Sequence, residues 1–460
     1  MFSLSKSSVF VLSLLASAGG LSSTSFAQGQ PQKAAATPAS AEPRWYKGNL
    51  HTHSLWSDGD DYPEMIADWY KREGYHFLGI SDHNVLQQGE RWFELKAPVS
   101  IGGNVTQRGG GPVLEKYLRR FGPDWVELRE ADGKRSVRLK PLTEYQSLLV
   151  EPGKFLMIPS EEITSSWKRA KTATTPELGG PVHINVTNPR EFVGPADADN
   201  AVEVMDKVLA SVEAQREKTG QPMFAHINHP NFRWGITAEE LTEVKRQRFF
   251  EVYNGHPGVN NEGDAVRLSM DAMWDVMLTR RLAELNLPVV YGVGVDDSHN
   301  YHDMVIGKSN PGRGWVMVRA KHLTAESIVN AMEAGDFYST SGVTLNDVKR
   351  EKGQLSVVVK AEPGVTYRIQ FIGTRKGTST ASELIPLPKD QPQRTLPHRR
   401  YNKDVGAVLN EVSGTSASYT LRGDEIYVRA KIISSKPKVN GSVAQEFETA
   451  WTQPLVSGGK

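Results

Sequence analysis

Short apolar runs alternate with segments of helical periodicity over residues 45–341 of the chain. Apolar residues recur at helical spacing in 61–75, and residues 265–286 form a strong amphipathic pattern. This alternation of strand-like and helix-like segments is typical of βα units around a mainly parallel sheet. Two stretches, 99–141 and 165–180, break the pattern and are interpreted as insertions. The hydrophobic pattern therefore predicts an α/β domain.

The pattern changes after residue 341, where apolar and polar residues alternate with a period of two. Gly, Pro and Asp break this alternation, which is typical of short strands joined by turns. The period-two segments are 354–363, 366–373, 416–423, 425–433 and 448–457. We therefore predict a small C-terminal β-sandwich over 342–460, with a long polar loop within 373–401.

The first residues have the layout of a secretory signal peptide. A positively charged residue precedes an apolar stretch from Val9 to Ala16, and small residues end the segment at Ala27. A membrane anchor is disfavoured because about 20 apolar residues are needed to span a bilayer. Residues 28–44 are rich in Ala, Pro and Gln without periodicity, as in a disordered tether. We expect an exported protein, periplasmic or secreted, with a signal peptide over 1–27 and no membrane span.

Composition restricts the chemistry more than the fold. The 460 residues include 54 Lys and Arg against 53 Asp and Glu, so no net field favours nucleic acid as the main partner. The chain contains no Cys, which excludes thiol nucleophiles, thiolate metal sites and disulfide bonds. Any metal site must therefore consist of His and carboxylate side chains. The 12 His residues are informative mainly through their positions.

Nearly every apolar run of the α/β segment ends in His, Asp or Glu. The carboxyl ends of parallel barrel strands meet on one face, so residues there become neighbours. His51 and His53 lie two residues apart and face the same side of a strand, as do Asp297 and His299. The candidate metal ligands at the run ends are His51, His53, Asp58, His83, Glu162, His183, His229, Asp297 and His299.

A set of this size implies more than one metal ion. Neutral imidazole nitrogens combined with hard carboxylate oxygens suit Zn, Mn or Fe, and nine such groups exceed what one ion can bind. We therefore predict two or three divalent metal ions. A carboxylate such as Glu162 can bridge two ions, and bridged ions activate water and stabilise both the attacking and the leaving oxygen.

Other His residues are interpreted as structural. A lone imidazole is more often held by one hydrogen bond than bound to a metal. We expect this environment for His76, His302, His322 and His398. His226 shares an apolar run with His229 but lies an odd number of residues away, so it should face the opposite side unless a bulge intervenes.

Six motifs occur in an order that resembles a known family. LHTHSLWSDG, GISDHN, PSEEIT, VHIN, NHP and DDSH look like the motifs of the PHP (polymerase and histidinol phosphatase) superfamily of metal-dependent hydrolases. The added β-module ending in AWTQP resembles, more narrowly, the exported bacterial branch named for the CehA and McbA carbaryl hydrolases. The resemblance implies a distorted seven-stranded (β/α) barrel over 45–341, a di- or trinuclear site, and the same nine ligands.

The motif PSEEIT contains two candidate carboxylates, Glu161 and Glu162. The resemblance favours Glu162, because the order Glu-Ile-Thr matches the family's Glu-Ile-Ser. Glu161 would then point away from the site, since neighbouring strand residues face opposite sides.

The expected reaction is hydrolysis of a phosphodiester or phosphomonoester by a metal-bridged hydroxide. No protein nucleophile is needed, and the chain has no Gly-x-Ser-x-Gly motif. Asp82 is a candidate for orienting a ligand or relaying a proton, with a turn cap as the alternative. His256 ends the sixth run and is a candidate acid for the leaving group, with a turn histidine as the alternative.

The substrate is expected to be an anionic small molecule. Arg233, which follows the His229 run, and Lys168, in the 165–180 insertion, are candidate donors to a phosphoryl group. Each is otherwise a solvated surface charge. Trp234 and Trp167, which adjoin them, are candidates for an apolar wall.

Two other functions remain open on the sequence alone. The same metal site could hydrolyse a carbamate, ester or amide, as the carbaryl-hydrolase resemblance implies. Alternatively, the chain is a non-catalytic exported binding protein with structural metals. Nine ligands shared among two or three ions leave positions for water, which favours catalysis because structural sites are closed by protein ligands. The sequence indicates neither the native metal nor the oligomeric state.

Overall fold

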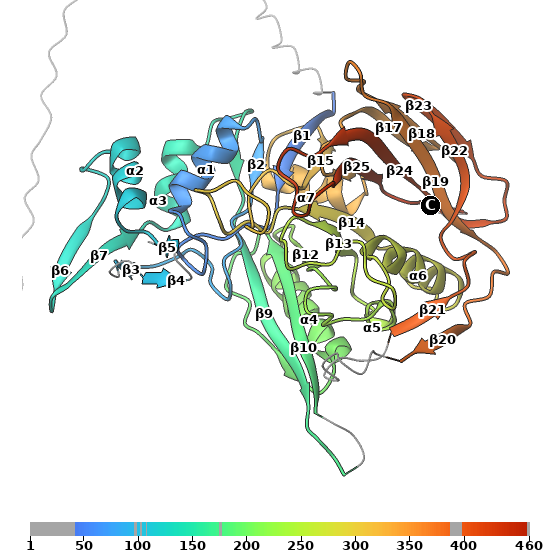
Figure 1. Cartoon of the computed structure of the whole chain (residues 1–460), viewed down its shortest axis with the longest axis horizontal. Coiled ribbons are helices and arrows are strands. Elements are labelled where there is room, and N and C mark those ends of the chain that lie inside the picture. Colours follow the sequence, from blue (N-terminus) through green and yellow to red (C-terminus); the bar gives the residue numbers. More distant parts are fainter. Residues whose placement is uncertain are drawn as a thin grey trace, which may run out of the picture. The chain divides into compact units, whose positions relative to one another are not determined.

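The computed structural model describes residues 42–95, 99–101, 104–106, 108–173, 177–386 and 398–457. The described residues make up one compact unit (Figure 1). The expected signal peptide and nearly all of the expected tether lie outside the described residues. Among the described helices, none is both long enough and apolar enough to cross a membrane.

The largest sheet contains strands from both ends of the described chain. Its strands are β1 (Arg44–Asn49), β2 (Phe77–Leu78), β8 (Leu156–Met157), β15 (Trp315–Ala320), β16 (Phe337–Thr340), β19 (Tyr367–Arg375), β22 (Ala407–Ser413), β24 (Glu425–Pro437), β25 (Phe447–Thr452) and β26 (Leu455–Val456). Their order is β22-β19-β24-β25-β16-β15-β1-β2-β8, and β26 pairs with β24. β1, β2 and β8 run parallel, whereas β15 and β16 join antiparallel.

The second sheet lies in the middle of the sequence. Its strands are β9 (Ser160–Arg169), β10 (Leu178–Thr187), β11 (Asp197–Ala198), β12 (Phe224–Ile227), β13 (Phe249–Asn254) and β14 (Tyr291–Val295). Their order is β11-β9-β10-β12-β13-β14. β9 and β10 form a long antiparallel hairpin, which extends past the neighbouring strands in Figure 1 and includes the expected insertion at 165–180.

The prediction of a mainly parallel sheet is therefore wrong for part of the fold. β12, β13 and β14 are parallel, but β10 is antiparallel to both neighbours. It is the second strand of the hairpin with β9, and it also runs opposite to β12. Two isolated parallel bridges connect the two sheets, Thr52 with Ser298 and His83 with Glu162. Among the described residues, the paired strands form a mixed α/β fold without one closed barrel, so the seven-stranded barrel stays a prediction.

Smaller sheets and helices complete the fold. The remaining strands are β3 (Arg91–Glu94), β4 (Val99–Ile101), β5 (Asn104–Thr106), β6 (Leu128–Ala131), β7 (Lys134–Leu139), β17 (Leu345–Glu351), β18 (Gln354–Val359), β20 (Ser382–Ile385), β21 (His398–Tyr401) and β23 (Ser416–Thr420). The helices are α1 (Pro63–Arg72), α2 (Pro112–Phe121), α3 (Leu142–Leu149), α4 (Ala201–Thr219), α5 (Ala238–Glu243), α6 (Met270–Ala283) and α7 (Ala325–Glu333). The expected long loop within 373–401 thus contains the end of β19 and the paired strands β20 and β21.

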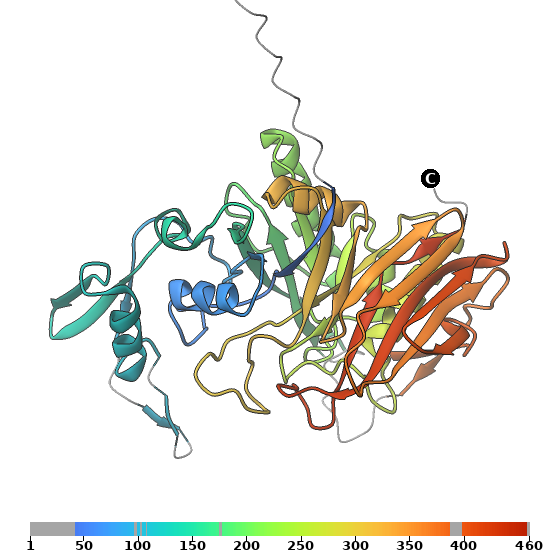
Figure 2. The same ribbon diagram turned by 90° about the horizontal axis from the view of Figure 1, so that it is seen from above.

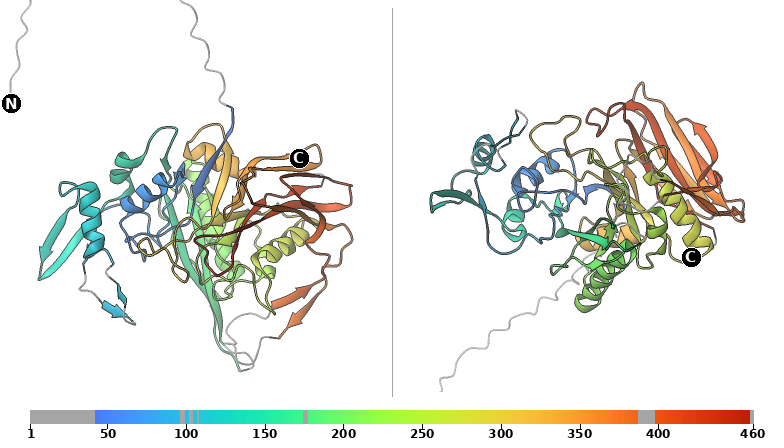
Figure 3. Two further views of the ribbon diagram at one scale, coloured as in Figure 1. Left: turned by 45° about the horizontal axis from the view of Figure 1, so that its top comes forward. Right: turned by 60° about the horizontal axis from the view of Figure 1, so that its bottom comes forward.

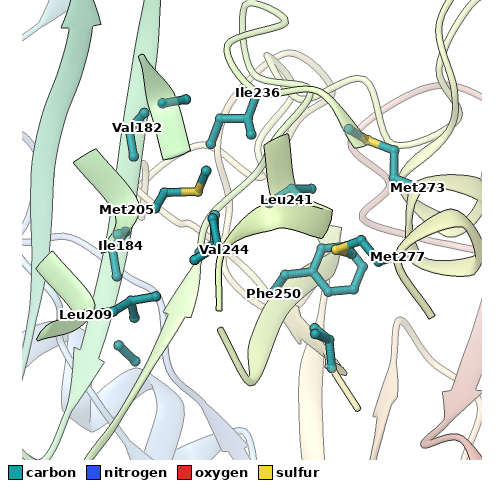
Figure 4. Packing of buried hydrophobic residues seen from close by; sticks show 14 of the residues in the cluster. Val182, Ile184, Met205, Leu209, Ile236, Leu241, Val244, Phe250, Met273 and Met277 are labelled. Carbon is teal, nitrogen blue, oxygen red and sulfur yellow. The ribbon is translucent and has the colours of Figure 1, made fainter. Parts of the chain in front are cut away.

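The largest hydrophobic cluster contains residues of the second sheet and of helices α4, α5 and α6 (Figure 4). Val182 and Ile184 alternate along β10, so both project from the same face. They belong to the cluster that also contains Leu209 on α4 and Met277 on α6. This packing fixes the strands whose ends carry several of the proposed ligands.

The C-terminal strands continue the large sheet, because β25 pairs with β16. Leu355 and Val357 of β18 share a hydrophobic cluster with Ile369 and Phe371 of β19, so the sheet β17-β18-β23 packs on the large sheet. The C-terminal strands therefore lie in two facing layers, one in the large sheet and one in the sheet β17-β18-β23. The closed β-sandwich and the boundary at residue 342 stay predictions.

Helix α6 lies beside the C-terminal strands, as both views of Figure 3 show. The guanidinium of Arg429 on β24 is 1% exposed and contacts two carboxylates of α6. Its Nη2 donates to Asp275 Oδ2 at 2.6 Å and lies 2.8 Å from Asp271 Oδ1. This buried ion-pair network therefore joins the α/β part of the chain to the C-terminal strands.

Replacing Arg429 by Ala is expected to lower the free energy of unfolding by about 3–5 kcal/mol, because the buried carboxylate of Asp275 loses its cation, whereas Asp271 keeps Lys431. Arg246→Ala is the control, since the exposed Arg246 contacts Glu213 at the surface and its loss should cost less than about 1 kcal/mol. Denaturant unfolding of both variants measures the difference. Equal effects would contradict the structural role of the network.

Candidate metal centre

His51 and His53 follow β1 directly and flank Thr52. Because Thr52 forms a bridge with Ser298, its two neighbours project to the same side. Both imidazoles are fully buried, and their ring centroids lie 5.1 Å apart. The structure therefore has the same-side pair that their spacing predicts.

The carboxylate of Glu162 on β9 lies at the centre of the cluster. Its Oε1 lies 3.4 Å from His51 Nε2 and 3.0 Å from His183 Nδ1. Its Oε2 lies 3.2 Å from His53 Nε2 and 2.8 Å from His83 Nδ1. One buried carboxylate thus contacts imidazoles from three separate segments of the chain.

The neighbouring Glu161 is directed elsewhere. Its Oε1 accepts a hydrogen bond from the backbone N–H of Val193 at 2.7 Å. Burial raises the pKa of Glu161 to about 8. Within the described part of the chain it belongs to no group of possible metal ligands. Of the two carboxylates in the motif, Glu162 is the one that faces the cluster.

Asp297 connects the His51 and His53 pair to the end of β12. Its Oδ1 lies 3.2 Å from His51 Nε2 and 3.3 Å from His53 Nε2. Its Oδ2 lies 3.9 Å from Nε2 of His229. Asp297 is therefore close enough to share an ion with each of these three imidazoles.

Asp58 occupies the outer side of the cluster. Its Oδ1 lies 3.3 Å from His299 Nε2, and its Oδ2 lies 3.5 Å from His83 Nε2. The side chain of Asp58 is 51% exposed, whereas the other proposed ligands are buried or partly buried. Asp58 thus lies where the cluster meets solvent.

All nine proposed ligands belong to overlapping groups whose ligand atoms lie within 4.8 Å of one another. The four His residues expected to be structural belong to no such group among the described residues. His76 Nδ1, for example, accepts a hydrogen bond from the backbone N–H of Lys47 at 3.0 Å. The structure therefore brings the proposed ligands together and leaves these four His residues outside the cluster.

The donor set fits divalent metal ions. Two ligand atoms about 2.1 Å from one tetrahedral Zn ion lie about 3.4 Å apart, close to the 3.2–3.3 Å that separates His53 Nε2 from Glu162 Oε2 and Asp297 Oδ1. His51 Nε2, His53 Nε2 and Glu162 Oε2 are buried and make no hydrogen bond within the described part of the chain. Buried polar atoms normally have a partner, and a shared ion would supply it.

Glu251 on β13 is a member of the cluster that the sequence analysis missed. Its Oε1 lies 2.6 Å from His51 Nδ1, and its Oε2 accepts hydrogen bonds from the backbone N–H of His229 and from Asn254 Nδ2, both at 2.8 Å. A carboxylate on the far nitrogen of a ligating His fixes the orientation and tautomer of the ring. Glu251 therefore positions His51.

His226 lies behind the same carboxylate. Its Nε2 is 3.3 Å from Glu251 Oε1, and its ring is fully buried. It therefore does not turn away from the cluster as its odd spacing from His229 predicts. Asn254 completes this layer, because its Nδ2 donates both to Glu251 and to Asp297 Oδ2.

Backbone strain accompanies two of the proposed ligands. His229 has φ of 24° and Asp297 has φ of 50°, values that residues with a Cβ rarely adopt. Both residues follow directly on the ends of parallel strands, β12 and β14. Such strain is typical of functional sites, where the surrounding structure holds the residue in place.

The carboxylates and imidazoles shift one another's pKa in the metal-free site. Burial opposes the charged form of His83, but Glu162 and Asp58 outweigh it and raise the pKa to about 11. Burial similarly opposes the charge on His51, and Asp297 and Glu162 raise its pKa well above the ordinary value. His53 differs, because burial and the neighbouring His299 and His83 lower its pKa to about 4.

Metal binding is therefore expected to release protons at neutral pH. Metal ions bind the neutral imidazole. In the metal-free site the raised pKa values keep His51 and His83 charged at neutral pH, and His83 stays charged up to about pH 11. Loading should therefore release protons at pH 7, and the apparent affinity should increase as pH rises from 6 to 8. Calorimetry in buffers of different ionisation enthalpy measures this release. A binding heat that does not depend on the buffer would contradict the prediction.

A cavity of about 280 Å³ opens onto the cluster. It is lined by Asp58, His83, His183, Phe232, His229, His256, Pro257, Asp297, His299, Asn300, Gly307 and Ser309.

His256, a candidate acid, is thus at the cavity as predicted, with its ring centroid 5.5 Å from that of His299. Its Nδ1 accepts a hydrogen bond from the backbone N–H of Gly258, so the neutral ring carries its proton on Nε2.

Asp82, the other candidate catalytic residue, does not line the cavity. Its carboxylate accepts hydrogen bonds from the backbone N–H and the hydroxyl of Ser54, from Ser57 Oγ and from Gln87 Nε2, at 2.6–2.8 Å. These bonds fix the segment between His53 and Asp58. The contacts of Asp82 favour a role in positioning that segment over proton transfer.

The two candidate substrate-binding cations also lie outside the cavity lining. Arg233 is exposed, and its guanidinium lies over the ring of Phe232. Lys168 is 70% exposed near the tip of the β9–β10 hairpin, where it lies 3.6 Å from Glu177. Trp167 and Trp234 do not line the cavity either. Both cations have the solvated surroundings that were the alternative interpretation.

No family model matches the chain, and no curated protein matches it significantly. Among solved structures it resembles a two-domain protein of Bacteroides vulgatus ATCC 8482 that contains a predicted PHP-like metal-dependent phosphoesterase, with 13% identity, a TM-score of 0.37, and coverage of 93% of this chain and 100% of that one. A protein of Bifidobacterium adolescentis ATCC 15703, provisionally named a metal-dependent phosphoesterase, gives 11% identity, a TM-score of 0.26, and coverage of 56% and 89%.

Proposed function

We propose that this protein is an exported, metal-dependent phosphoesterase that holds two or three divalent ions and belongs to the PHP superfamily, in its CehA/McbA-like branch. One observation carries the proposal: nine imidazole and carboxylate groups from distant segments form one cluster beside a cavity that six of them line. Three of their buried atoms have no hydrogen-bond partner among the described residues. When bound, such ions lower the pKa of water and stabilise the charge that develops on a phosphoryl group. The order of the motifs and the signal-like first residues support the family and the export.

The residues of this chain have separable roles in the proposed reaction. The ligands hold the ions, while Glu251 and Asn254 orient His51 and Asp297. Phe232 and Pro257 form the apolar part of the cavity wall and exclude water from that side. Burial lowers the pKa of His256, so its ring is mainly neutral. Its Nδ1 is already an acceptor, so Nε2–H can donate a hydrogen bond to the leaving-group oxygen as charge develops there.

Replacing His256 by Ala should separate leaving groups by their need for a hydrogen bond. Loss of one donor to a developing oxyanion typically lowers a rate by about 10²-fold or more, which we expect with diphenyl phosphate. With bis-p-nitrophenyl phosphate the decrease should stay below about tenfold, because p-nitrophenolate is a stable anion that leaves without this donor. Steady-state kcat/KM for both esters tests this role, and equal losses would show that His256 does not donate to the leaving group.

The function is tested by loading the full chain with Mn or Zn and assaying three substrates. They are p-nitrophenyl phosphate, bis-p-nitrophenyl phosphate and 1-naphthyl methylcarbamate. We expect metal-dependent turnover of a phosphoester. Turnover of the carbamate alone would instead support the carbamate, ester or amide hydrolase. A chain that binds metal and turns over none of the three would contradict hydrolysis and support the non-catalytic binding protein.

A further inference from the structure

Three consecutive apolar residues are exposed beside the metal cavity. Met304, Val305 and Ile306 are 44%, 52% and 61% exposed, respectively. They lie in the long connection between β14 and β15, which projects from the strands in Figure 2. The next residue, Gly307, lines the cavity, as does Ser309. The apolar segment 304–306 therefore adjoins the rim of the site.

Such a segment needs an explanation. Single exposed apolar residues are ordinary on protein surfaces, whereas a consecutive exposed run is unfavourable unless it has a function. Contiguous exposed apolar surface commonly marks a binding site. Its position next to the cavity indicates what it contacts, because anything bound at the metal cluster that extends past Gly307 reaches this segment.

The segment is held in place by hydrogen bonds. The buried guanidinium of Arg313 donates to the carbonyl oxygens of Val305 at 3.3 Å, Lys308 at 2.5 Å and Gly255 at 2.9 Å. Its Nε also donates to the carbonyl of Asn440 in the C-terminal part, at 3.0 Å. The apolar residues are thus held on a fixed turn beside the cavity, and the turn that contains Asn440 supports them.

The charge of the cavity also favours an apolar substituent on the substrate. Its lining contains no Lys or Arg among the described residues, and Phe232 and Pro257 are part of it. Metal ions would therefore be the main positive charges that a substrate meets. A second negative charge on the substrate, away from the ions, would contact no cationic side chain of the cavity lining. An apolar substituent would contact Phe232 and Pro257.

We propose that Met304, Val305 and Ile306 form a subsite for an apolar substituent, so that the preferred substrates are phosphodiesters with an aryl or alkyl group next to the scissile bond. This inference rests on the proposed phosphoesterase function. It assigns substrate selection to the connection between β14 and β15, and it replaces Arg233 and Lys168 as the residues that select the substrate.

The test compares two diesters that have the same charge and the same leaving group. These are methyl p-nitrophenyl phosphate and phenyl p-nitrophenyl phosphate. The wild-type chain should prefer the phenyl ester by about tenfold in kcat/KM, since an apolar contact of this size discriminates by about that factor. The double variant Val305→Ser, Ile306→Ser should reduce the preference to about threefold or less. Val408→Ser is the matched control, because Val408 is 50% exposed on the edge strand β22, and it should retain the preference.

A binding measurement separates this inference from the function on which it rests. Phenylphosphonate and methylphosphonate cannot be hydrolysed by phosphoester cleavage, and calorimetry on the metal-loaded chain gives their Kd values. We expect the wild type to bind phenylphosphonate about tenfold more tightly than methylphosphonate, and the double variant to bind the two about equally. If the phosphonates bind in this way but no phosphoester is hydrolysed, the proposed function is overturned and the subsite is supported. Turnover without any preference, or equal or absent binding of both phosphonates, would overturn the subsite.

Discussion

Replacing Glu162 by Gln is expected to remove at least one metal ion from the cluster and to lower hydrolysis by more than about 10³-fold, a larger loss than the 10–100-fold typical of outer partners. The physical reason is the position of this carboxylate. It lies within 3.5 Å of imidazoles from His51, His53, His83, His183 and His229. Its pKa is held well below the ordinary value by His83, His51 and His183 against the effect of burial, so it is a carboxylate and not an acid. The amide has the same shape without the charge.

The neighbouring residue supplies the control. Glu161→Gln makes the same chemical change one position away, in a side chain that is also buried but bonds to the Val193 backbone. Its raised pKa of about 8 leaves it mainly protonated at pH 7, so an amide replaces it closely. Metal content by elemental analysis and kcat/KM should change little. A Glu161→Gln variant that loses its metal, with Glu162→Gln intact, would show that the assignment is reversed.

The second large effect is expected for Glu251→Gln, which should weaken metal binding by about 10–100-fold. The carboxylate accepts from His51 Nδ1 and from the backbone N–H of His229, so its loss frees the orientation of one ligand and the backbone of another. Competition with a chelator of known affinity measures the change. Unlike Glu162→Gln, this variant should regain most of its activity at high metal concentration, because the ligands themselves remain.

Glu240→Gln is the matched control for Glu251→Gln. Glu240 is also a buried glutamate, but it forms the capping box at the start of α5 with Thr237. Its replacement should leave metal affinity unchanged while lowering thermal stability slightly. Equal metal affinities for all three chains would remove Glu251 from the account of the site.

The sequence predicts those parts of the site that local pattern determines. A spacing of two residues places His51 beside His53, and the bridge from Thr52 to Ser298 confirms that geometry. The ends of apolar runs lead to the other candidate ligands because strand ends meet in space. The helices at α1 and α6 likewise follow from periodic apolar residues.

Long-range contacts are what local pattern leaves undetermined. Glu251 stands inside the apolar run FFEVYN, which reads as an ordinary buried strand, and its partner His51 is 200 residues away. The available signal was the cost of burying a carboxylate without a partner. Arg233 and Lys168 adjoin predicted elements in the sequence, but adjacency does not determine which side chains line a cavity. The pairing of β25 with β16 is equally long-range, so the sequence did not indicate that the C-terminal strands join the main sheet.

The central claim is that the converging His and carboxylate groups bind metal, and stoichiometry tests it most directly. The full chain is stripped with chelator, loaded with Mn or Zn, desalted, and measured by elemental analysis beside Glu162→Gln and Glu161→Gln. The structure predicts at least two ions per chain in the wild type and in Glu161→Gln, with fewer or none in Glu162→Gln. A wild-type chain that holds no ion, or the same metal content in all three proteins, would contradict the account.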